Sequence, residues 1–113
     1  MRLRYAPEAI RDLQETSRYI RDVLRNPTAT IHFSQQILRR CAALKDFPEM
    51  GASIQALTGH ETALRMMTCK SHVVLYQIDA DEDAVSVLRV IHTRRDYLRV
   101  LFGDILIEEP PEP

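Results

Sequence analysis

The residues of this chain that are best suited to chemistry lie in its C-terminal half. They carry guanidinium, ammonium, imidazole and phenol groups and comprise Arg65, Lys70, Arg89, His92, Arg94, Arg95, Tyr97 and Arg99. Guanidinium groups hold phosphate oxygens in pairs and stabilise charge that develops in a transition state. Histidine or tyrosine transfers protons, and tyrosine also stacks on a base. The set therefore favours phosphodiester chemistry, or the binding of an acidic surface, which needs the arginines but no titrating group.

Each of these residues also has a purely structural explanation. A strand arginine such as Arg65 or Arg89 usually lies across the solvent face of its sheet. His92 stands at a strand end, where a hydrogen-bonded structural histidine is more common than a catalytic base. Tyr97 fits a core position, and the arginines after the last strand could pair with nearby acids on a helix surface. The sequence leaves both explanations open.

Motifs of the common enzyme classes are absent from the sequence. It contains no glycine-rich dinucleotide or phosphate loop, no HExxH pair and no nucleophile elbow. We therefore expect no cofactor. The only cysteines, Cys41 and Cys69, have no histidine at metal-ligand spacing, so we expect reduced thiols, mostly buried, and no metal. The sequence leaves open whether these two cysteines form a disulfide.

A β-hairpin must position the C-terminal cluster. Two runs rich in β-branched and aromatic residues, 72–79 and 85–92, flank the acidic turn 80–84. Residues 63–68 and 2–5 are predicted to be further strands, which gives an antiparallel sheet of about four strands. Alternation in the last strand puts Leu88 and Val90 on one face and Val87 and Ile91 on the other.

Two amphipathic helices precede the sheet in the sequence. Pro7 suits the first turn of one helix, and Asn26-Pro27 ends that helix near Arg25 and starts the next. The stripe predicted to face the core in the first helix is Ile10, Leu13, Ile20 and Leu24, and that in the second is Phe33, Ile37, Cys41 and Leu44. With so short a link the helices form an αα-hairpin. We expect an α+β fold with this hairpin on one sheet face, and a loop over residues 52–62.

Length and charge predict one domain over residues 1–103 and an acidic tail over 104–113. At 27% charged residues and net charge −1, overall charge selects no partner. The four acids of the tail have no base among them, so the preceding chain is modestly basic. The tail also holds the apolar run Ile105-Leu106-Ile107, which must pack on the domain or meet another chain. No segment has the pattern of a membrane span or a signal peptide, so we expect a cytoplasmic protein.

Four segments in this order resemble the RelE/ParE superfamily of type II toxin–antitoxin toxins. They are residues 5–9 (YAPEA) with 12–13 (DL), 47–51 (FPEMG), 71–76 (SHVVLY) and 88–96 (LRVIHTRRD). The third and fourth are most similar to the ParE branch, whose members poison DNA gyrase. The RelE-like branch cleaves ribosome-bound mRNA and carries a basic residue where this sequence has Val73. The resemblance therefore favours a gyrase inhibitor that is not an enzyme over an mRNA endoribonuclease.

The resemblance implies partners as well as a fold. A cognate ParD-like antitoxin would neutralise the toxin in a hetero-oligomer, laying an amphipathic helix along the helical hairpin. The target would be gyrase, with the ribosome and mRNA as the alternative. A remnant that keeps the fold without potent activity is the third interpretation.

The residues expected at these sites fall in the C-terminal third of the chain, with one exception. The residues expected to contact the target are Arg89, His92, Arg94, Arg95, Tyr97 and Arg99. Those that a nuclease would use are Arg65, Arg89, His92, Arg94 and Tyr97. Those expected to contact the antitoxin, or another part of the chain, are Leu101, Phe102, Ile105, Leu106 and Ile107.

Overall fold

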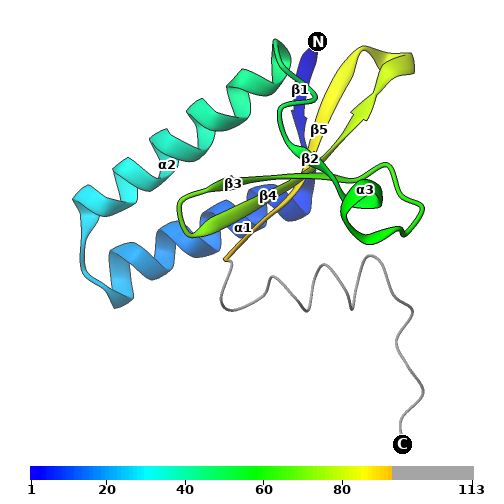
Figure 1. Ribbon diagram of the computed structural model, residues 1–113. Helices are drawn as coiled ribbons and strands as arrows, with labels where there is room; N and C mark the ends of the chain where they lie inside the picture. The colour runs from blue at the N-terminus through cyan, green and yellow to red at the C-terminus, as the bar shows by residue number, and fades with distance from the viewer. Residues whose placement is uncertain (93–113) are drawn as a thin grey trace, which may run out of the picture.

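The last two strands of the described chain, β4 (His72–Asp79) and β5 (Ala84–His92), occupy the middle of a five-stranded sheet. The computed structural model describes residues 1–92 (Figure 1). The sheet order is β1-β5-β4-β3-β2, with β1 at Arg2–Tyr5, β2 at Ala52–Ser53 and β3 at Arg65–Cys69. Helices α1 (Pro7–Arg18) and α2 (Pro27–Ala42) form the expected hairpin, and the short α3 spans Ile54–Thr58. The predicted α+β class is confirmed.

The sheet is mixed, whereas the sequence predicted about four antiparallel strands. β1 pairs with β5 in parallel, with Leu3 opposite Val85 and Tyr5 opposite Val87. A parallel neighbour is possible because the helical hairpin gives the chain a long crossover between the two strands. The fifth strand, β2, lies in the segment 52–62 that was predicted to be a loop. Two residues are too few to show the alternation by which a strand is recognised.

The second helix packs as its apolar spacing predicted. The Asn26 side chain caps α2 by accepting a hydrogen bond of 3.0 Å from the backbone N–H of Ala29. Ile37, Cys41 and Leu44 are fully buried in the main core beneath the sheet, and Phe33 packs against them. Both cysteines are free thiols, and burial raises the pKa of the Cys41 thiol to about 11.

The predicted stripe of the first helix was wrong at two of its four positions. Ile10 is 45% exposed and Leu24 57% exposed, while Ala9 is fully buried against the sheet. The small side chain of Ala9 lets α1 lie close to β5, which turns the helix away from the predicted phase. Beyond Arg18 the chain continues as a π-helical turn, Tyr19–Val23, which breaks the period of 3.6 residues. Apolar side chains of the hairpin are therefore left outside the core.

A β-bulge in β5 makes the predicted assignment of side chains to the two faces of the last strand wrong. Val87 lies opposite Tyr76 and Arg89 opposite Leu75, so Leu88 is an extra residue between them. Val87 and Val90 consequently share the main core with the helices. Leu88 and Ile91 belong to a second cluster on the other face, built on Ile54, Leu64, Val73 and Leu75. Simple alternation had paired Leu88 with Val90 and Val87 with Ile91.

The loop between α2 and β2 is held by the buried side chain of Tyr76. Its hydroxyl donates to the Pro48 carbonyl at 2.8 Å and accepts from the Gly51 N–H at 2.9 Å. A Cβ atom at Gly51 would lie 2.5 Å from the Met66 carbonyl oxygen and 2.6 Å from this hydroxyl. Glycine is therefore required for the loop to approach the sheet this closely.

We expect Tyr76→Phe to lower the free energy of unfolding by about 1–3 kcal/mol, because the buried Gly51 N–H and the partly buried Pro48 carbonyl both lose their partner. Urea unfolding followed by circular dichroism measures the change. Phe47→Leu is the control, since it alters an exposed side chain of the same loop and should stay within about 0.5 kcal/mol of the parent. Equal stability of Tyr76→Phe and the parent would show that the hydroxyl does not hold the loop.

Candidate functional site

Asp12 on α1 holds the C-terminal half of β5. Its Oδ2 accepts hydrogen bonds from Arg89 Nε at 2.8 Å and from the Val90 N–H at 2.9 Å, and its Oδ1 accepts from Arg89 Nη2 at 3.1 Å. The β1–β5 ladder ends at Tyr5 and Val87, so the Asp12 carboxylate replaces the missing strand neighbour of Val90. The side chains of Asp12 and Arg89 are 13% and 29% exposed, which makes this a largely desolvated, bidentate ion pair.

His92 lies beside this ion pair, at the last described position of β5. It faces His72 of β4 across the ladder, with ring centroids 5.2 Å apart and the rings nearly perpendicular. His72 is buried, and its ring also contacts Phe33 of α2 at 4.8 Å. A small cavity of about 100 Å³ separates His92 from the Asp12 and Glu15 side of α1. The two target-binding candidates Arg89 and His92 are thus brought together at one end of the sheet.

Arg65 is placed elsewhere and contacts the loop after α2. Its Nη2 donates to the Gly51 carbonyl at 2.7 Å and to the Glu49 carbonyl at 3.2 Å. It belongs to β3, on the other side of β4 from β5. The remaining predicted site residues lie outside the described residues and comprise Arg94, Arg95, Tyr97, Arg99, Leu101, Phe102, Ile105, Leu106 and Ile107.

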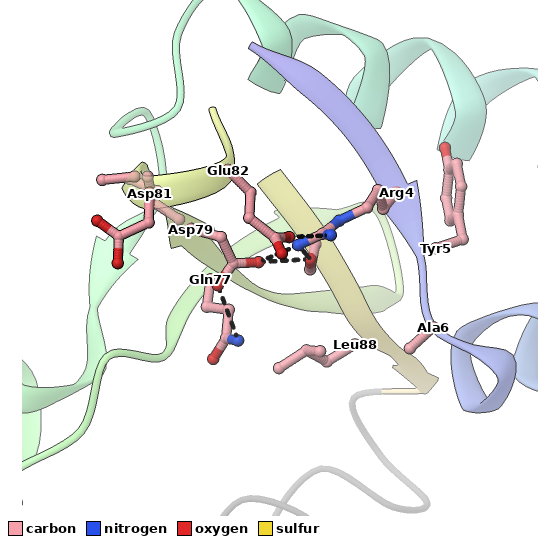
Figure 2. Close-up of a pocket in the computed structure, with 11 residues that line it drawn as sticks. Arg4, Tyr5, Ala6, Gln77, Asp79, Asp81, Glu82 and Leu88 are labelled. Atoms are coloured by element: carbon pink, nitrogen blue, oxygen red, sulfur yellow. Dashed lines mark hydrogen bonds and ion pairs between the residues drawn. The ribbon is translucent and has the colours of Figure 1, made fainter. Parts of the chain in front are cut away.

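A polar pocket of about 710 Å³ lies at the opposite end of β5 and was not predicted. Figure 2 shows Arg4 reaching from β1 toward Asp79 at the end of β4 and Glu82 in the β4–β5 turn. Arg4 donates to Asp79 Oδ2 at 2.7 Å and to Ser86 Oγ at 3.1 Å, and Ser86 donates to the same Asp79 oxygen at 2.7 Å. The hydrogen bond from Ser86, with those from Arg4 and Gln77, lowers the pKa of Asp79.

The ion pairs of Arg4 in this pocket attach β1 to the turn between β4 and β5. The carboxylates of Asp79, Asp81 and Glu82 outnumber the one arginine that lines it, so its charge has the wrong sign for a phosphate. The acidic residues of the turn 80–84 were visible in the sequence, but no local pattern indicated that Arg4 would contact this turn.

A groove of about 530 Å³ runs between the two long helices on the outside of the hairpin. Its lining is apolar, neutral polar and basic, and consists of Leu13, Gln14, Ser17, Arg18, Arg21, Ser34 and Leu38, which we call the hairpin groove. No carboxylate is among these lining residues, and Leu38 is 49% exposed. Ile10 of α1 and Leu24, which follows the π-helical turn, are further exposed apolar residues of the hairpin. The groove thus combines an apolar floor with a positive rim.

The described residues offer little for covalent chemistry. Ser71 Oγ lies 3.4 Å from His72 Nδ1, which is longer than the 2.6–3.2 Å typical of an activated nucleophile. Within residues 1–92, no group of three or more His, Cys, Asp or Glu side chains is placed so that it could hold a metal ion. None of the helices in the same range has the length and apolar composition needed to cross a bilayer.

Comparisons with known proteins agree with the fold. A family model described as "ParE toxin of type II toxin-antitoxin system, parDE" matches residues 3–97. No curated protein sequence matches the chain significantly. A solved structure titled "Chromosomal ParDE TA system from P. aeruginosa" superposes with a TM-score of 0.69 at 18% identity, covering 83% of this chain and 97% of that one. At that identity the superposition supports the fold alone.

We expect Asp12→Ala to lower the free energy of unfolding by about 2–3 kcal/mol, because it leaves the Arg89 guanidinium and the Val90 N–H without their acceptor. Chemical denaturation measures the loss. Glu15→Ala removes a neighbouring, exposed acid of the same helix and should cost less than about 0.5 kcal/mol. A loss at Asp12 no larger than that at Glu15 would contradict the role given to this carboxylate.

Proposed function

Because the chain belongs to the ParE toxin family of type II toxin–antitoxin systems, with 3–97 matching the family model, we propose that it arrests growth by binding DNA gyrase and that a cognate antitoxin neutralises it. The proposal has two parts, a target surface at the end of β5 and an antitoxin surface on the helical hairpin. The two surfaces are supported by different observations.

The antitoxin surface is supported by the exposed apolar side chains of the hairpin. Ile10, Leu24, Ile31 and Leu38 are each between 45% and 58% exposed, although helices α1 and α2 cover the main core. Of these four, Leu38 lines the hairpin groove, and an exposed apolar side chain in a groove is typical of a surface that a partner covers. An amphipathic helix of a ParD-like antitoxin fits this groove, with its apolar face on Leu13 and Leu38 and acids near Arg18 and Arg21. This groove is the observation that carries the antitoxin part.

The choice of gyrase over mRNA is supported by what the described arginines do. Arg89 is engaged by Asp12, and Arg65 by two loop carbonyls, so neither points openly toward a scissile phosphate. Val73, at the position where RelE-like nucleases carry a basic residue, is 1% exposed and packs in the second core cluster. A phosphate would therefore find little positive charge on this part of the sheet. Target binding is therefore assigned mainly to Arg94, Arg95, Tyr97 and Arg99, which follow His92 in the sequence.

We expect the double variant Arg94→Ala/Arg95→Ala to lose toxicity, because it removes two adjacent cations from the target surface, while antitoxin binding is unchanged. Growth after induction of the toxin alone measures toxicity, and calorimetry measures antitoxin binding. Arg11→Ala/Arg39→Ala removes the same charge from exposed helix positions and should remain toxic. A toxic Arg94→Ala/Arg95→Ala variant would show that these arginines are not needed at the target.

The same induction separates the candidate targets. Filamentation with a DNA-damage response supports gyrase as the target. Rapid loss of translation with cleaved mRNA would contradict it in favour of the RelE-like nuclease. Normal growth with abundant folded protein would contradict toxicity itself and indicate an inactive member of the family.

We expect Leu38→Asp to weaken antitoxin binding by about 10–100-fold, because it replaces an apolar contact of the groove by a carboxylate that the antitoxin's apolar face would have to desolvate. Calorimetry with the purified antitoxin measures the change. Leu57→Asp is the matched control, since Leu57 is also exposed but belongs to α3, whose Ile54 packs in the second core cluster. Equal affinities of the Leu38→Asp and Leu57→Asp variants would exclude the hairpin groove as the antitoxin surface.

A further inference from the structure

We infer that residues 105–112 of this chain bind its own hairpin groove, so that the groove is self-covered before the antitoxin arrives. The competition with antitoxin rests on the proposed function, whereas the self-contact does not. Three observations support the self-contact: the chemistry of the groove, the composition of the C-terminal residues, and the point at which the described chain ends.

The groove carries positive charge that the described residues only partly compensate. Arg21 is bonded to Asp22 through Nε at 2.9 Å and Nη2 at 3.3 Å, which uses one edge of its guanidinium. Arg18 forms no ion pair with a carboxylate of residues 1–92. Between these arginines, Leu13 and Leu38 present apolar surface. A complementary occupant would therefore offer a short apolar run next to carboxylates.

The sequence of the C-terminal residues has this composition. Ile105, Leu106 and Ile107 are followed by Glu108, Glu109 and Glu112, with no base after Arg99. The apolar run can cover Leu13 and Leu38, and the glutamates that follow can meet Arg18 and Arg21. No other stretch of the sequence places three consecutive large aliphatic residues directly before two acids.

The end of the described chain lies close enough to the groove for this contact. His92 borders the small cavity that also contacts Tyr19, and Arg18 of the groove is the residue before Tyr19. The two sites thus flank one helix, whose diameter with side chains is about 10–12 Å. Twelve residues separate His92 from Ile105, enough to span up to about 40 Å. The connection is therefore long enough to reach around α1.

The tether makes the chain's own tail the favoured occupant over a second copy. A connection of only twelve residues keeps the tail at an effective concentration on the order of millimolar, so even a weak contact is populated. Self-coverage would shield Leu38 and its neighbours from water and from aggregation when no antitoxin is present. An antitoxin would first displace the tail. The apparent affinity of the antitoxin would then be its intrinsic affinity multiplied by the fraction of chains whose groove is uncovered.

The absence of tryptophan from the sequence allows a direct test in the full-length chain. Ile107→Trp introduces a single reporter, and we expect its fluorescence to be blue-shifted and protected from acrylamide. Adding Leu38→Asp should shift the emission to that of a solvated tryptophan, whereas adding Leu57→Asp should not. A solvated spectrum in Ile107→Trp itself, or a blue shift that survives Leu38→Asp, would overturn the inference. Loss of the blue shift on dilution would also overturn it, because it would indicate binding between copies.

Measuring antitoxin affinity distinguishes a failure of this inference from a failure of the proposed function. Replacing Ile105, Leu106 and Ile107 together by Ser should raise antitoxin affinity about two- to tenfold, because the competitor is removed. Unchanged affinity would overturn the competition. If the fluorescence of the Ile107→Trp variant responds to Leu38→Asp while antitoxin binding does not, the self-contact stands and the proposed antitoxin surface fails.

Discussion

The Asp12 carboxylate is the contact on which the arrangement of helices and sheet most depends. It joins the first helix to the last described strand by accepting hydrogen bonds from both the side chain of Arg89 and the backbone of Val90. Because β1 ends at Tyr5, the edge of β5 beyond this point has no strand neighbour among residues 1–92, and the Asp12 side chain from α1 satisfies the Val90 N–H instead. The same contact holds the C-terminal half of β5, up to the last described residue His92, against α1.

Fixing α1 in this way has a consequence for the outer face of the hairpin. The helix lies with Ala9 toward β5, and the apolar side chains of Ile10 and Leu24 are left toward solvent. Such exposure costs stability in an isolated chain, and this cost is offset when a partner or the chain's own tail covers the surface. The apolar surface that the core leaves uncovered is thus the surface proposed for neutralisation by the antitoxin.

Features set by local sequence were predictable, and features set by distant contacts were not. Residues 72–79 were predicted as a strand with the bounds of β4, and α2 packs on its predicted stripe, because an unbroken helix or strand keeps its period. The π-helical turn after Arg18 and the extra residue Leu88 break that period, and neither has a simple residue signature. Asp12 and Arg89 are 77 positions apart, so no local pattern could connect them. For the same reason the candidate site was predicted only as a group of arginines at a strand end, without the partner that holds Arg89.

The central claim is that this chain is a gyrase-directed toxin that its antitoxin neutralises. It is tested most directly by adding the purified protein to DNA gyrase and relaxed plasmid with ATP, and measuring supercoiling with and without an equimolar amount of antitoxin. We predict that the protein alone inhibits supercoiling in proportion to its concentration and that the antitoxin restores it. Full supercoiling activity in the presence of excess folded protein, which nevertheless arrests growth in cells, would contradict this claim.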